Sequence, residues 1–65
     1  MNESKLLAYL AKEVVKEKAA QADFLAAGRA ENHAEYRHVC GIIRGLSTAE
    51  QLINDLVQRL ETNDD

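Results

Sequence analysis

Residues 36–60, with the sequence YRHVCGIIRGLSTAEQLINDLVQRL, decide the fold of this chain. Apolar residues recur in this stretch at alternating spacings of three and four, the heptad pattern of a helix that packs along a partner. The pattern runs for more than three repeats and has one polar interruption, at Glu50. Its members are Tyr36, Val39, Ile43, Leu46, Glu50, Ile53, Val57 and Leu60.

A second apolar row widens the hydrophobic face of this helix. Ile42, Ala49 and Leu56 lie beside the heptad row, and Cys40 lies on its other flank. Such an arc is wider than the stripe that one partner helix covers, so we expect the helix to meet a second copy of the chain or another protein. We expect Glu50 to set register or oligomeric state. The expected interface residues are Tyr36, Val39, Ile42, Ile43, Leu46, Ala49, Ile53, Leu56, Val57 and Leu60.

The N-terminal half of the chain predicts a second helix. The chain has no proline, and its ten alanines and many Leu, Glu, Lys and Gln residues favour helix throughout. Asn2 or Ser4 can cap the start of this helix, and Gly28 is a suitable stop. Lys18 and Gln21 interrupt its expected buried stripe, which consists of Leu7, Leu10, Ala11, Val14, Ala22 and Leu25.

The link between the two helices is short. Asn32 followed by Glu35 resembles a capping box that opens the second helix, which leaves residues 28–32 as the connection. Short links favour antiparallel neighbours. The sequence therefore predicts an all-α fold, an antiparallel two-helix hairpin over about 3–28 and 33–61, as a single domain spanning 1–65.

An alternative divides the C-terminal helix in two. Gly45 followed by Ser47 and Glu50 also has the pattern of a helix end and a new capping box. The three-four spacing nevertheless passes through residues 43–53 without a phase shift, which favours one continuous helix.

Length and charge limit the function classes. A chain of 65 residues buries little surface by itself, and a single cysteine allows no internal disulfide, so association is the remaining source of stability. Eleven acidic residues against eight basic ones argue against a nucleic-acid partner. We expect no secretory signal peptide and no membrane span, because charged residues follow Ala11 directly.

Few side chains are candidates for metal binding or catalysis. The spacings between His33, His38 and Cys40 are five and two, whereas ligands on one helical face need three or four, so we expect no metal site and no cofactor. Cys40 has the position of a small apolar residue rather than a nucleophile, and we expect no catalytic residue. Gly41 and Gly45 form a GxxxG pair, for which we expect a role in close helix packing, with a kink or no role as alternatives.

Residues 35–46, EYRHVCGIIRGL, resemble a segment of small helical proteins from tailed bacteriophages, with the pattern E-Y-x-x-x-C-G-x-I-x-G-L. The resemblance implies a phage origin and a helical build, and no particular activity. It places the protein in the cytoplasm of the bacterial host or in the virion.

These observations favour a non-enzymatic structural or adaptor protein that acts by helix-mediated association, with a homodimeric four-helix bundle as the expected state. One alternative is a host-directed regulator that inhibits a bacterial protein. Another is a nucleic-acid binder that uses Arg37, Arg44 and Arg59, by architectural analogy to the plasmid Rop hairpin, with which the chain shares no motif.

Overall fold

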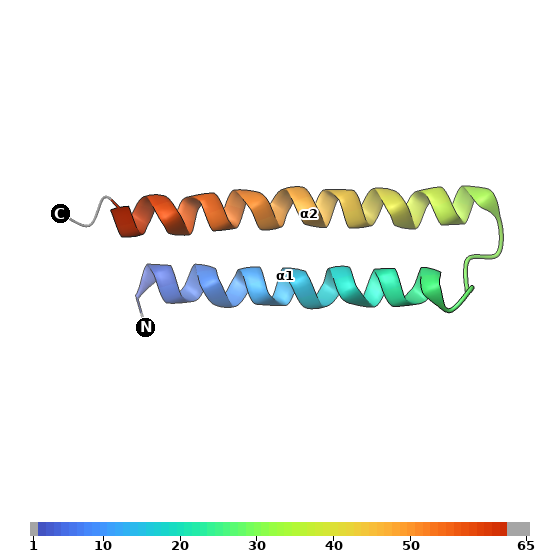
Figure 1. The fold of residues 1–65 in the computed structure, drawn as a ribbon, viewed down its shortest axis with the longest axis horizontal. Coiled ribbons are helices and arrows are strands. Elements are labelled where there is room, and N and C mark those ends of the chain that lie inside the picture. The colour runs from blue at the N-terminus through green and yellow to red at the C-terminus, as the bar shows by residue number, and fades with distance from the viewer. Residues whose placement is uncertain (1, 63–65) are drawn as a thin grey trace.

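Two antiparallel helices make up the part of the chain that the computed structural model describes, residues 2–62. Helix α1 spans Glu3–Ala26 and helix α2 spans His33–Thr62. They lie side by side along their lengths and are joined by one short loop, so the start of α1 and the end of α2 meet at the same end of the molecule (Figure 1). The predicted all-α hairpin is confirmed.

Local hydrogen bonds define both ends of α1. The Asn2 side chain accepts a hydrogen bond of 2.8 Å from the backbone N–H of Lys5, as an N-cap does. At the other end Gly28 has a φ of 72°, a conformation that glycine adopts without a Cβ clash. Its N–H donates to the Leu25 carbonyl, and the N–H of Arg29 donates to the Phe24 carbonyl, which is a Schellman motif. Gly28 therefore stops the helix as predicted, although α1 itself ends at Ala26.

Helix α2 begins at the predicted cap and has no break. Asn32 Oδ1 accepts a hydrogen bond of 2.8 Å from the backbone N–H of Glu35. The helix then continues through Gly45, so the three-helix alternative is wrong. The Thr48 hydroxyl donates to the carbonyl of Arg44 one turn earlier, at 3.1 Å, a hydrogen bond that threonine makes inside a continuous helix.

The contact between the helices is a narrow seam with heptad spacing on both sides. Within residues 2–62, the most buried side chains are Ala11 and Val39, at 9% and 5% exposure. More residues along the same two rows are half-buried. We call these rows the seam: Ser4, Leu7, Ala11, Val14, Lys18, Gln21 and Leu25 on α1, and Val39, Ile43, Leu46, Glu50, Ile53, Val57 and Leu60 on α2.

The predicted stripe of α1 is wrong at two positions. Leu10 and Ala22 are exposed, whereas Lys18 and Gln21 lie in the seam. The heptad periodicity of α2 requires a partner row with the same spacing, and on α1 that row passes through polar residues. Lys18 can occupy it because its methylene stem packs while its ammonium reaches a carboxylate.

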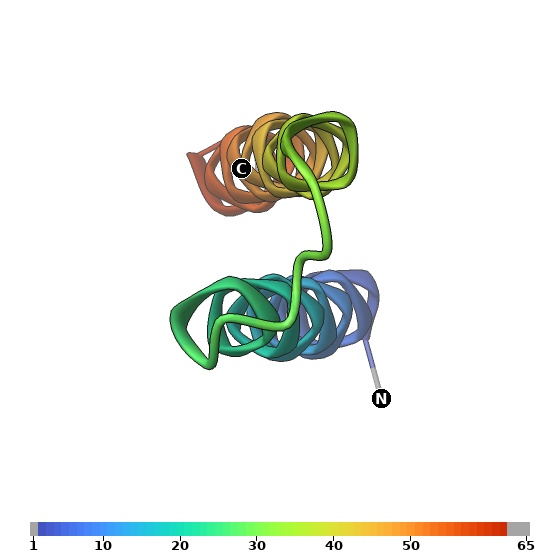
Figure 2. The ribbon, with the colours of Figure 1, turned by 90° about the vertical axis from the view of Figure 1, so that its right-hand side faces the viewer.

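The hairpin forms a single layer of structure. Its extents are 52 × 17 × 12 Å and its radius of gyration is 15.0 Å, whereas a compact domain of this length has a radius of about 11 Å. The end view shows the two helices crossing at a small angle, and no other part of residues 2–62 covers either side of the pair (Figure 2). Over residues 2–62, neither helix has an apolar stretch of the kind that crosses a membrane.

Candidate association surface

Most of the predicted interface residues of α2 pack against α1 within the hairpin. Val39 is buried, and the other apolar seam residues of α2 (Ile43, Leu46, Ile53, Val57 and Leu60) are half-buried along α1. Ile42 and Ala49 are half-buried on the flank. Tyr36 and Leu56 are exposed, at 48% and 45%. A partner would therefore contact the flank of α2 rather than its seam.

The unburied apolar surface is divided between both helices. The sequence predicts that the excess apolar surface lies on α2. This prediction is wrong in part, because α1 also has large exposed apolar side chains. Leu10 is exposed because the seam on α1 passes through Lys18 and Gln21 instead. Among the described residues, the large apolar side chains that are 42–64% exposed are Leu6, Tyr9, Leu10, Val15, Tyr36, Leu52 and Leu56.

Two polar contacts across the seam set the register of the helices. Lys18 Nζ lies 2.7 Å from Glu50 Oε1. Near the open end of the hairpin, the Ser4 hydroxyl donates to Glu61 Oε2 at 3.5 Å. Between these two contacts the register brings Leu10 of α1 level with Leu56 of α2.

Leu10 and Leu56 also lie on the same edge of the hairpin. Each heptad contributes two residues to the seam, the first followed three positions later by the second. Leu10 and Leu56 each directly precede the first of these two residues, and in an antiparallel pair the residues at this position of both helices lie on one edge. Phe24, Ala49 and Ile42 have the same position in other heptads, as do Glu3, Glu17 and Glu35, and Leu6, Gly45 and Leu52 are one turn from members of the set. We call this surface the apolar edge, and define it as Leu6, Leu10, Phe24, Ile42, Gly45, Ala49, Leu52 and Leu56.

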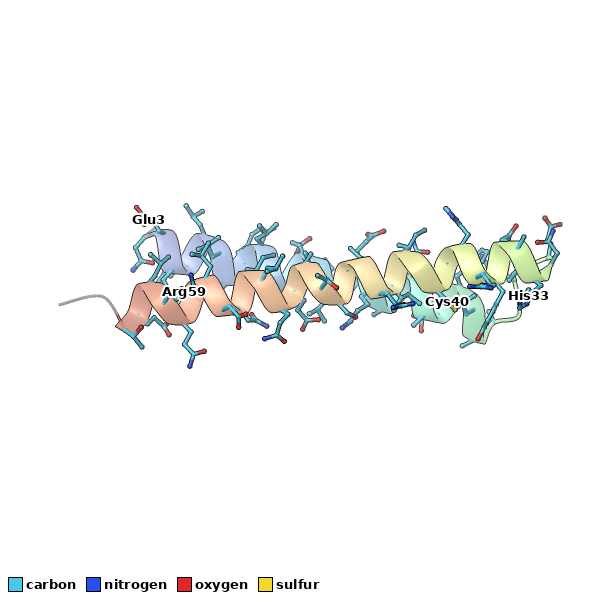
Figure 3. All side chains as sticks on the ribbon, turned by 90° about the horizontal axis from the view of Figure 1, so that it is seen from above. Glu3, His33, Cys40 and Arg59 are labelled. Carbon is cyan, nitrogen blue, oxygen red and sulfur yellow. The ribbon has the colours of Figure 1, made fainter. Side chains whose placement is uncertain are left out.

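The opposite edge has smaller side chains. The positions that follow the second seam residue of each heptad are Ala8, Val15 and Ala22 on α1, and Cys40, Ser47, Asn54 and Glu61 on α2. Figure 3 shows the two edges: Glu3, which directly precedes Ser4 of the seam, lies toward one edge and Cys40 toward the other. The hairpin therefore has its large apolar side chains gathered on one edge and mainly small side chains on the other.

Glu50 forms a half-buried ion pair instead of facing solvent. Its side chain is 26% exposed and that of Lys18 is 30% exposed. A slip of one heptad between the helices would separate the two charges and leave each beside apolar seam residues. This geometry supports a role for Glu50 in register, with Lys18 as the partner that sequence reasoning missed. The signal was present, since Lys18 continues the three-four spacing of α1 and has the opposite charge.

Gly41 and Gly45 make no close contact with α1. A Cβ added at either position would have no atom within 4 Å. Gly41 lies on the side of α2 away from the seam, and Gly45 lies on the apolar edge. Close packing at these glycines thus stays a prediction about a partner, and concerns Gly45 more than Gly41.

The chemistry-bearing residues near the loop form a small group, in which His33 and Tyr36 are exposed and Cys40 is half-buried. The rings of His33 and Tyr36 stack at a centroid distance of 6.3 Å. Cys40, one turn further along α2, raises the pKa of the Tyr36 phenol by hydrogen bonding and by its negative charge when ionised. Within residues 2–62 no three His, Cys, Asp or Glu side chains come together as a metal site would need.

No protein-family model matches the chain, and no curated protein or solved structure matches it significantly.

Proposed function

We propose that the chain is a non-enzymatic structural or adaptor subunit that acts by helix-mediated association, with a homodimer as its favoured state. The observation that carries the proposal is the amount of surface left open. The chain exposes 5145 Å², whereas a compact protein of 7.2 kDa exposes about 4,100 Å². The difference, about 1,000 Å², is of the same order as the roughly 800 Å² per partner that a standard interface buries.

The type of exposed surface supports the same proposal. Within residues 2–62, seven large apolar side chains are 42–64% exposed, and several lie together on the apolar edge. Contiguous apolar surface of this kind marks association sites. Each ionisable side chain between residues 2 and 62 is exposed or half-buried, whereas catalytic groups are typically set in a cleft that excludes water.

We further propose a tailed-phage origin, with action in the bacterial cytoplasm or in the virion. Its support is the resemblance of residues 35–46 to a segment of phage proteins, together with a surface suited to assembly.

Native mass spectrometry of the purified chain over a thousandfold dilution tests the association. We expect a dimer at high concentration that dissociates on dilution, and a monomer at every concentration would contradict self-association. Mass spectrometry of purified virions tests the virion location. Recovery of one host protein in stoichiometric amount from a lysate, with a chain that is otherwise monomeric, would instead favour the host-directed regulator.

A further inference from the structure

We propose that a second copy of the chain docks on the apolar edge, with the loops of both hairpins at the same end of a four-helix bundle. This inference rests on the self-association proposed above, and adds which face is buried and which way round the two copies lie.

The first argument is the difference between the two edges. On the apolar edge Leu10 lies level with Leu56, and Leu6 and Leu52 lie one turn from them. These four side chains are 45–64% exposed, and they make one apolar patch that spans both helices. The opposite edge has Val15 at 42% exposure, among alanines, Ser47 and Asn54. Burial of the first edge removes far more apolar surface from water.

The second argument is the size of the side chains along the apolar edge. Gly45 and Ala49 lie near the middle of α2, flanked by Ile42 on the loop side and by Leu52 on the other side. An added Cβ at Gly45 would have free space within its own hairpin. The α2 side of this edge is therefore low at its middle, and a helix of the second copy can approach closely there.

Charge selects the orientation of the second copy. Glu13 and Glu17 lie on the α1 side of the same edge, since Glu17 directly precedes Lys18 of the seam and Glu13 is one turn before it. With loops at opposite ends, each α1 would cover the partner's α1 and bring these carboxylates against their own copies. Like charges held together in an interface disfavour that arrangement.

With loops at the same end, each α1 covers the partner's α2. Glu13 and Glu17 then face an uncharged stretch of that helix, at Leu52 and Ala49. Glu3 and Arg59, which lie at the same end of the hairpin on different helices (Figure 3), each meet the oppositely charged residue of the second copy. All neighbouring helices in the resulting bundle are antiparallel.

A matched pair of variants tests whether the apolar edge is the surface that the second copy covers. Leu10→Gln and Val15→Gln each replace an apolar side chain of α1 with similar exposure, on the apolar edge and on the opposite edge respectively. We expect Leu10→Gln to raise the dimer dissociation constant at least about tenfold, and Val15→Gln to change it by about twofold or less. Leu56→Gln repeats the test on α2, and circular dichroism verifies that each variant keeps its helices.

A distance measurement tests the orientation. In a Cys40→Ser background, Glu31→Cys introduces one label site in the loop of each copy. Loops at the same end place the two labels within roughly 20 Å, given helix separations of 8–10 Å, whereas loops at opposite ends separate them by about 45 Å, the length of α2. Double electron–electron resonance on spin-labelled protein distinguishes these values.

Each failure has its own signature. A monomeric wild-type chain overturns the self-association and this inference with it. If the dimer persists in Leu10→Gln and Leu56→Gln but is lost in Val15→Gln, the chain self-associates through another surface, and the proposal that the apolar edge is buried is wrong. A label separation near 45 Å overturns the orientation and keeps the face.

Discussion

Lys18 and Glu50 occupy seam positions that a coiled coil ordinarily gives to leucine or valine. Their carboxylate–ammonium contact of 2.7 Å satisfies both charges, but each charge loses part of its hydration, since the side chains are 70–74% covered. Such pairs add little net stability and contribute to specificity, because a misaligned register leaves both charges without partners.

This balance predicts the outcome of a double-mutant cycle. Lys18→Leu or Glu50→Leu alone leaves one half-buried charge unpaired, and we expect each to lower the free energy of unfolding by about 1 kcal/mol. The double variant removes both charges and fills the seam with apolar side chains, so it should equal or exceed the wild type. Urea unfolding at fixed protein concentration measures the three changes, and additive single effects would contradict the coupling.

Tyr36 gives a prediction about pH. Because Cys40 raises the pKa of the phenol, the folded state favours neutral Tyr36 relative to the unfolded chain. The contribution of this pKa shift to the free energy of unfolding is fully present below the ordinary tyrosine pKa of about 10. It is lost as the pH rises through the higher pKa of the folded state. Cys40→Ser should move one of the two tyrosine transitions to lower pH in an absorbance titration, and Tyr36→Phe should remove that transition. A transition that Cys40→Ser leaves in place would contradict the coupling.

At the scale of the helices, the caps determine where α1 and α2 begin. Asn32→Ala removes the acceptor for the Glu35 N–H and should destabilise the hairpin by about 1 kcal/mol. Asn54→Ala is the matched control, because Asn54 lies exposed inside α2, where alanine is the better helix former. We expect that control to leave stability unchanged or to raise it slightly in thermal unfolding. Equal losses in both variants would mean that the cap has no specific role.

The glycines of the helices and of the loop should respond with opposite signs. Gly41→Ala is expected to stabilise α2 by about 0.5–1 kcal/mol, because nothing lies within 4 Å of the added methyl group and alanine loses less entropy. Gly28→Ala should destabilise by about 1 kcal/mol, since φ at this position is 72°. Urea denaturation of both variants gives the comparison, and a destabilised Gly41→Ala would reveal packing at that glycine which the hairpin itself lacks.

Sequence reasoning predicts the helices well because their signals are local. Caps at Asn2 and Asn32, the stop at Gly28 and the spacing of α2 each depend on residues within a few positions of one another. The exact seam of α1 could not be chosen by hydrophobicity, since Leu10 is more apolar than Lys18 and yet lies outside it. That choice depends on Glu50, which is 32 residues away in the chain. The same limit applies to the apolar edge, which exists only once the register brings Leu10 level with Leu56.

At the scale of the molecule, a single layer of two helices leaves each helix covered on one side. Domains ordinarily bury their apolar faces between two packed layers, and here the described chain supplies one. A second hairpin on the apolar edge would complete the pair of layers. Folding and association are then coupled, because surface at the edge is buried in the dimer alone.

Coupling of this kind makes thermal stability depend on protein concentration. If the dimer is the stable folded form, mass action favours it as concentration rises, and the unfolding midpoint of the wild type should rise by several degrees over a hundredfold increase. Leu10→Gln should flatten this dependence, whereas Val15→Gln should preserve it, because Val15 lies on the edge away from the second copy. Far-ultraviolet circular dichroism in cells of different path length measures all three proteins. A wild-type midpoint that is independent of concentration would mean that the hairpin reaches its full stability alone, with the apolar edge open to water.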